Sequence, residues 1–198
     1  MRPWSVSLLV AAMLMFVLVG CSDNATPPVA PADGSAKAPT LQKPDEVSVP
    51  VSFNGPKTLT GEGEMWTAGG KLQMKRFGVR ELVQTAEPRI AGPMLHYLSQ
   101  TADLQTGEGP CHGTLTIYPP AAGGGVWEGT YHGYRSRTAN PAIFTLPLNV
   151  VGHGKGGTID GMKITLTVVL TVFTGPPYAP PLVPYHWVGS GVGILKEH

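Results

Sequence analysis

Residues 123–134 read GGGVWEGTYHGY, a glycine turn followed by a segment that alternates bulky and small side chains. In an extended strand, Trp127 and Tyr131 share one face with Gly129 and Gly133. Glycine weakens a strand, because it loses more backbone entropy on folding and adds no packing. Its repeated use indicates a sheet that bends sharply or that leaves room for an opposing side chain. The stretch therefore predicts one strand of a strongly curved sheet.

The same use of glycine recurs along the chain, between short runs of β-branched, aliphatic and aromatic residues. The other glycine-rich stretches are 61–63, 107–109, 152–157 and 189–193. The clearest alternation lies in residues 161–173, where apolar and mostly polar side chains take turns. Strands are predicted at 47–53, 57–66, 72–84, 90–101, 111–118, 126–136, 143–151, 159–174 and 185–195. We expect an all-β fold, a single closed antiparallel barrel of about eight strands, because closure removes exposed edges. Residues 152–157 are expected to form a hairpin turn, and residues 175–181, rich in proline, a loop.

The first twenty residues are typical of a lipoprotein signal peptide. Arg2 precedes an uncharged apolar segment from Ser7 to Val19, and Leu18-Val19-Gly20-Cys21 resembles the bacterial lipobox. The apolar segment is short for a membrane span, which needs about 20 residues. By resemblance to bacterial lipoproteins, Cys21 is expected to carry the lipid. The residue directly after Cys21 is Ser22 rather than Asp, which resembles lipoproteins that are sorted to the outer membrane. In a Gram-negative cell, this resemblance predicts that the protein lies on the periplasmic face of the outer membrane.

Residues 21–46 are predicted to be a lipidated tether between the signal peptide, 1–20, and the barrel domain, 47–198. Five prolines and five alanines lie within residues 22–46, with almost no aliphatic side chains. Such a segment cannot bury enough apolar surface to become ordered. The tether is therefore expected to be disordered and to hold the domain near the membrane.

The charge balance excludes one class of partner. Loss of Arg2 leaves 13 basic side chains against 13 acidic ones, and no basic cluster remains. Nucleic-acid binding is therefore not predicted. No cofactor is predicted either, and Cys111, the only cysteine besides Cys21, is interpreted as a buried structural thiol.

Three ordered motifs resemble those of uncharacterised proteins with an allene oxide cyclase-like barrel. They are Glu87-Pro88-Arg89-Ile90-Ala91-Gly92, then Gly125-Val126-Trp127-Glu128-Gly129-Thr130, then the glycine-rich run from Gly154 to Gly161. Glu87 stands where that pattern favours Asp. The resemblance covers about residues 60 to 195 and implies an eight-stranded, calycin-like barrel. It carries over no catalytic residue, and fold alone does not fix activity.

Candidate ligand-binding residues are aromatic side chains that alternation places on shared faces, together with one arginine. They are Trp66, Trp127, Tyr131, Trp187 and Arg89. A small barrel either fills its interior with such side chains or holds one small ligand there. Arg89 either braces the turn after Pro88, for example on Asp160, or captures a ligand carboxylate.

Two other groups of residues are candidates for chemistry. His112, His132 and Glu128 would share a face if segments 111–118 and 126–136 pair, and they could then bind a divalent ion; the alternative is a solvated outer face. Glu62, Glu64 and Glu81 could supply acid–base chemistry if burial separated their pKa values. The alternative is a row of carboxylates facing water.

Three functional hypotheses follow. The first is a lipid-anchored envelope protein, not an enzyme, that binds a small apolar or amphipathic ligand or a partner protein. The second is an isomerase or cyclase acting on a lipid-like substrate inside the barrel. The third is a structural or assembly lipoprotein acting through surface contacts.

Overall fold

The computed structural model describes residues 46–174 and 186–197, which form an all-β fold. The strands are β1 (Glu46–Ser52), β2 (Thr58–Leu59), β3 (Glu64–Ala68), β4 (Lys71–Val83), β5 (Gly92–Asp103), β6 (Gly109–Ile117), β7 (Val126–Arg137), β8 (Ile143–Lys155), β9 (Lys163–Phe173) and β10 (His186–Lys196). Two single 3-10 turns, η1 (Pro120–Ala122) and η2 (Gly157–Ile159), lie in connections, and no α-helix occurs in these two ranges. The prediction of an all-β protein is confirmed.

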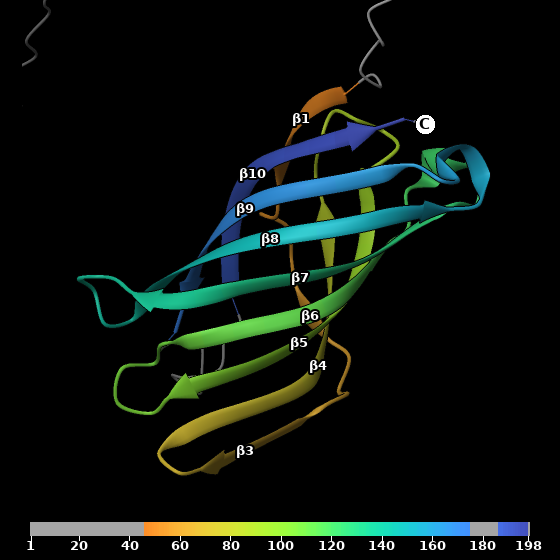
Figure 1. The fold of residues 1–198 in the computed structure, drawn as a ribbon. Coiled ribbons are helices and arrows are strands. Elements are labelled where there is room, and N and C mark those ends of the chain that lie inside the picture. Colours follow the sequence, from red (N-terminus) through yellow and green to blue (C-terminus); the bar gives the residue numbers. More distant parts are fainter. Residues whose placement is uncertain (1–45, 175–185, 198) are drawn as a thin grey trace, which may run out of the picture. The chain divides into compact units, whose positions relative to one another are not determined.

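The strands form one antiparallel sheet in the order β1-β10-β9-β8-β7-β6-β5-β4-β2, with β3 also on β4. From β4 to β10 each strand pairs with the next along the chain, while β1 returns to pair with β10. Figure 1 shows these strands as a strongly tilted, curled sheet. This meander follows from the short glycine and proline turns, which can join only antiparallel neighbours.

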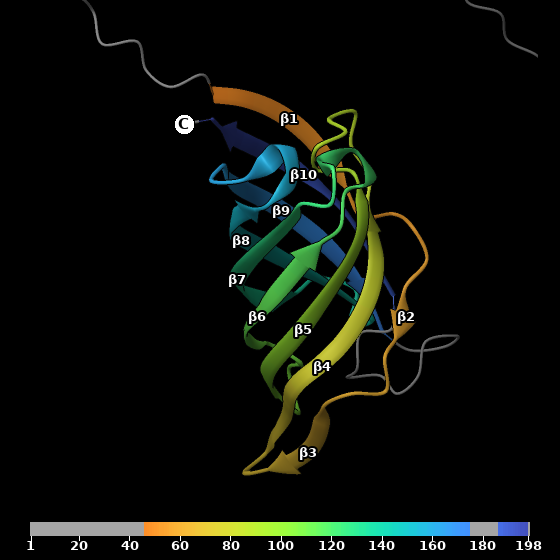
Figure 2. The same ribbon diagram turned by 90° about the vertical axis from the view of Figure 1, so that its right-hand side faces the viewer.

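The prediction of a closed barrel is wrong, because the sheet is an open half-barrel. Its two margins, β1 and the end of β4, meet at a single bridge between Ser52 and Gln84. Two backbone hydrogen bonds make that bridge, Ser52 N–H to Gln84 O at 2.8 Å and Gln84 N–H to Ser52 O at 3.0 Å. No ladder extends from it, because β2 and β3 pair with the margin of β4 instead (Figure 2).

The split of the predicted strand 57–66 has a local cause. The structure has β2 and β3 there, separated by Gly61 and Gly63, whose φ angles are +79° and +101°. These left-handed conformations interrupt a ladder and favour glycine, which has no Cβ. Conversely, residues 152–155, predicted as a turn, belong to β8, and the turn follows at 156–162.

Burial shows which strand face points inward. Trp127 is 0% exposed and Tyr131 is 6% exposed, so the aromatic face of residues 126–134 forms part of the interior. On β9, the predicted alternation places Ile164, Leu166 and Val168 inward, each 1% exposed. Gly113 on β6 leaves room for the Tyr131 side chain: a Cβ there would lie 2.4 Å from the Tyr131 hydroxyl oxygen.

Several predictions fall outside the described residues. They are the signal peptide 1–20, Cys21 with the tether up to residue 45, the loop 175–181, and the first residue of the predicted strand 185–195. Across the described ranges, no helix has the length and apolar character that crossing a membrane requires.

Candidate functional site

A cavity of about 50 Å³ lies inside the curled sheet. Aliphatic side chains form most of its wall, among them Leu98, Leu115, Val150, Leu166 and Val168. Polar side chains from four strands interrupt that wall: Glu81, His96, Gln100, Tyr131, Arg135 and Trp187. Apolar cavities with a few convergent polar groups are the usual form of small-molecule sites.

One row of polar groups runs from β4 across to β7. His96 Nδ1 lies 3.0 Å from the Tyr131 hydroxyl oxygen, and His96 Nε2 lies 3.2 Å from Glu81 Oε1. We assign the Tyr131 hydroxyl as the donor to Nδ1, because a neutral imidazole then carries its proton on Nε2, which faces the carboxylate. The Nε2 contact lacks hydrogen-bond geometry, and Nε2 has no hydrogen-bond partner among the residues described. The contact between His96 Nε2 and Glu81 Oε1 is therefore electrostatic, and Nε2 could still donate a hydrogen bond to a better-placed acceptor.

Two further groups hold the carboxylate of Glu81. Trp187 Nε1 donates a hydrogen bond to Glu81 Oε2 at 3.0 Å, and Lys57 Nζ lies 3.7 Å from the same oxygen. Lys57 also donates to the carbonyls of Phe53 and Gly55 at 2.9 and 2.8 Å. The carboxylate thus has an amine and an N–H donor beside it.

Burial changes the acid–base character of this row. It lowers the pKa of Lys57 below its ordinary value, and the nearby Glu81 carboxylate only partly offsets this effect. Burial also raises the pKa of Tyr131 well above its ordinary value, and electrostatic interactions with Cys111 and Glu81 add to that shift. The Tyr131 phenol therefore stays protonated and acts in the cavity as a hydrogen-bond donor.

A second polar region of the lining contains Gln100 on β5 and Arg135 on β7. Gln100 is 4% exposed, and its Nε2 has no hydrogen-bond partner among the residues described. Arg135 is fully buried, and its guanidinium carbon lies 3.9 Å from the centroid of the Phe144 ring. Burial lowers the pKa of Arg135 to about 10, with the Cys111 sulfur opposing that shift, so the side chain remains cationic at neutral pH.

The structure brings two of the five predicted ligand residues to the cavity, Tyr131 and Trp187. Trp66 lies on β3 and is 44% exposed, away from the interior. Trp127 is buried in the core but is not part of the cavity lining, and neither is Arg89.

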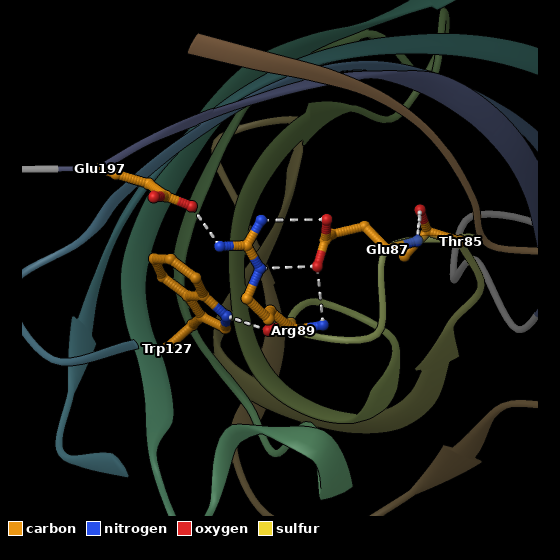
Figure 3. A network of polar contacts seen from close by, with 5 residues as sticks. All are labelled: Thr85, Glu87, Arg89, Trp127 and Glu197. Atoms are coloured by element: carbon orange, nitrogen blue, oxygen red, sulfur yellow. Dashed lines mark hydrogen bonds and ion pairs between the residues drawn. The ribbon is translucent and has the colours of Figure 1, made fainter. Parts of the chain in front are cut away.

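Arg89 is part of a network of ion pairs and hydrogen bonds near the ends of β4 and β10 and the start of β7 (Figure 3). Its Nε donates to Glu87 Oε1 at 2.8 Å, its Nη2 lies 3.2 Å from Glu87 Oε2, and its Nη1 pairs with Glu197. The carbonyl of Arg89 accepts a hydrogen bond from Trp127 Nε1 at 2.7 Å. These contacts join the turn after β4 to Trp127 on β7 and to Glu197 after β10, as expected of the bracing role. The suggested partner Asp160 instead accepts from the Gly156 N–H at 2.7 Å.

The predicted metal ligands are only partly brought together. His112 and His132 are register partners across β6 and β7, and both are exposed, as the predicted pairing required. Glu128 lies four residues along β7, about 13 Å away, and forms an ion pair with Lys155. Within the described ranges no three His, Cys, Asp or Glu side chains gather as a metal site would need.

The three candidate carboxylates do not act as a group. Glu62 and Glu64 are exposed, whereas Glu81 is 8% exposed and lines the cavity. Only Glu81 therefore has the burial that acid–base chemistry needs.

Sequence reasoning missed Lys57, His96, Gln100 and Arg135. The signal for three of them was alternation: His96 and Gln100 are in phase with Met94 and Leu98 on β5, and Arg135 is in phase with Trp127 and Tyr131 on β7. A polar side chain at a strand position that otherwise carries buried apolar residues indicates a functional or structural role. Lys57 lies between strands, and no comparable signal marks it.

Comparisons of the chain with protein-family models, with curated proteins and with solved structures find no match.

Proposed function

We propose that this protein binds a small amphipathic molecule in the cavity of the curled sheet. The observation that carries the proposal is the set of buried polar side chains in an otherwise aliphatic wall. Two of their nitrogens, His96 Nε2 and Gln100 Nε2, have no hydrogen-bond partner among the described residues. Buried polar atoms are normally paired, so a ligand or water that supplies acceptors there would be stabilised.

The size of the cavity limits the ligand. A volume of about 50 Å³ exceeds the minimum for a single water molecule, yet it is small for a drug-sized ligand. It suits a short molecule whose apolar part contacts the aliphatic wall. A longer molecule would require side chains to change rotamer, as is common on binding.

Native mass spectrometry of the protein purified from its own host tests this function. We expect an added mass of a small organic molecule that dissociates on denaturation. Val168→Phe should abolish it, because Val168 lines the cavity and is 1% exposed. Val169→Phe is the matched control on the opposite face, where Val169 is 52% exposed. A clean mass in repeated purifications would count against ligand binding and favour action through surface contacts.

A second candidate function, proton transfer on a bound substrate, is favoured by the row Tyr131–His96–Glu81. In this row the group that can accept a proton is the Glu81 carboxylate, which Trp187 Nε1 and His96 Nε2 face, and a buried carboxylate oriented by N–H groups can act as a general base. We expect such an enzyme to exchange hydrogens beside the carbonyl of small ketones for deuterium in D2O, which NMR detects. Glu81→Gln should abolish the exchange, because an amide cannot take up the proton; an equal rate in that variant would exclude this function.

We also propose that the chain is a lipoprotein of the cell envelope, attached through lipid at Cys21 and facing the periplasm. This proposal rests on the sequence 18–21 and on Ser22. Cys21→Ala should release the protein from the membrane fraction, and unchanged retention would contradict lipid attachment. The relationship to allene oxide cyclase-like proteins remains a prediction from the three glycine motifs.

A further inference from the structure

We infer that the part of the cavity lined by Gln100 and Arg135, here called the anion end, binds the carboxylate of a small monocarboxylic acid. This inference rests on the proposed function and names the chemical class of its ligand.

Gln100 is the first reason. Its side chain is more than nine-tenths buried, it lines the cavity, and its Nε2 donates to no described residue. An amide NH2 offers two hydrogens and no charge. Leaving them unpaired in an apolar wall destabilises the folded state, so an acceptor placed in the cavity would be held strongly.

Arg135 is the second reason. It is 0% exposed and contributes to the same cavity wall, and its guanidinium lies against the Phe144 ring. A guanidinium donates through a planar fork that matches the two oxygens of a carboxylate. Packing against the face of an aromatic ring restricts the orientation of that fork and so favours one orientation of the anion.

The position of the other charges assigns the carboxylate to this end. The Glu81 carboxylate lies in the row with His96 and Tyr131, and it would repel an anion bound beside it. Four residues separate His96 from Gln100 on β5 and Tyr131 from Arg135 on β7, about 13 Å along each strand. The anion end is thus the part of the cavity farther from the negative charge.

The apolar wall between the two regions restricts the charge of the ligand. Leu98, Leu115 and Val168 offer no hydrogen bonds, so each additional charge would have to lose its water without compensation. One cation and one amide suit a single carboxylate, and a dianion such as phosphate would remain partly unpaired. The aliphatic part of the acid would contact the leucine and valine side chains.

Titration of the purified, isotope-labelled protein with straight-chain acids of two to eight carbons tests the inference. The matched primary alcohols are titrated in parallel, and NMR shifts of β5 and β7 report binding. We expect the acids to bind at least about tenfold more tightly than the alcohols, as hydrogen bonds to a charged group would produce. Gln100→Glu, which keeps the shape and adds a negative charge, should weaken acid binding at least about tenfold while alcohol binding persists. Gln100→Leu should weaken it as well, and removal of an unpaired buried amide should not unfold the protein.

The outcomes separate the two proposals. Equal binding of acids and alcohols, or unchanged acid binding in both Gln100 variants, would overturn the anion end and leave a ligand cavity. If neither series binds, the inference fails and the proposed function loses its support as well. Arg135→Lys keeps the charge without the fork and should reduce acid binding; if it does not fold, the two Gln100 variants decide.

Discussion

His96 on β5 and Tyr131 on β7 are hydrogen-bonded at 3.0 Å although β6 lies between their strands. Their rings meet edge to face, with centroids 5.8 Å apart and planes at 64°. The contact is achieved because β6 presents Gly113, the register partner of Tyr131, where any other residue would place a side chain. The geometry of the polar row therefore depends on a glycine that has no functional group of its own.

Tyr131→Phe should destabilise the fold by about 1–3 kcal/mol, the usual effect of leaving a buried hydrogen-bonding group without its partner. The unpaired group would be His96 Nδ1, since the phenyl ring itself still fits. Urea denaturation measures the change. Tyr134→Phe, at a position that is 49% exposed, is the control and should change stability by less than about 0.5 kcal/mol. Equal effects of the two substitutions would show that the hydrogen bond contributes nothing.

Gly113→Ala should destabilise the protein and displace Tyr131. The new Cβ would lie 2.2 Å from the Tyr97 carbonyl oxygen and 2.4 Å from the Tyr131 hydroxyl oxygen, well inside van der Waals contact. Overpacking of this kind costs about 1–3 kcal/mol. Thermal unfolding tests it against Gly55→Ala, whose Cβ would meet only the Leu82 Cβ, at an ordinary 3.5 Å. A Gly113→Ala protein as stable as the wild type would mean that β6 can move away from β7.

The fold class could be predicted from local patterns because alternation and glycine punctuation are local properties. The alternation in β9 and the aromatic face of β7 both correspond to buried side chains. Closure could not be predicted in the same way. It depends on whether β1 and β4 pair over their length, and such non-local pairing leaves no periodic signal. In the structure, β1 and the margin at the end of β4 pair only at the bridge between Ser52 and Gln84.

The candidate site was predictable only in part for a related reason. Tyr131 and Trp187 were found because large aromatic residues in a strand favour the interior. The contact between Glu81 on β4 and His96 on β5 depends on how close their side chains come to each other. The alternation along each strand predicts that both side chains point inward but does not predict the distance between them. Arg89 was equally ambiguous from sequence, because its partner Glu197 lies 108 residues away.

The Glu87–Arg89 pair should make the stability of the protein depend on pH in the acid range. The Arg89 side chain, through its hydrogen bonds, lowers the pKa of Glu87 below its ordinary value of 4.5. The folded state then binds fewer protons than the unfolded state as pH falls through this range, so the contribution is present above about pH 4.5 and lost below the folded pKa. Glu87→Gln should be less stable than the wild type at pH 7, and the difference should shrink as the solution is acidified.

Denaturant unfolding at several pH values between 3 and 7 measures that difference. Glu64→Gln, at an exposed position on β3, controls for the loss of one carboxylate. A gap between wild type and Glu87→Gln that stays constant down to pH 3 would contradict the assigned role of the ion pair.

The Cys111 thiol should be inert in the folded protein. It is 2% exposed, and burial raises its pKa to about 11, although the positive charge of Arg135 partly offsets that shift. At pH 8 only about one thiol in a thousand would be the reactive thiolate. In a Cys21→Ser background, where Cys111 is the one cysteine left in the sequence, iodoacetamide should modify the native protein far more slowly than the urea-unfolded protein. Modification at similar rates would mean that the sheet opens between β6 and β7 often enough to expose the anion end, and carboxylate binding there would then have to be weak.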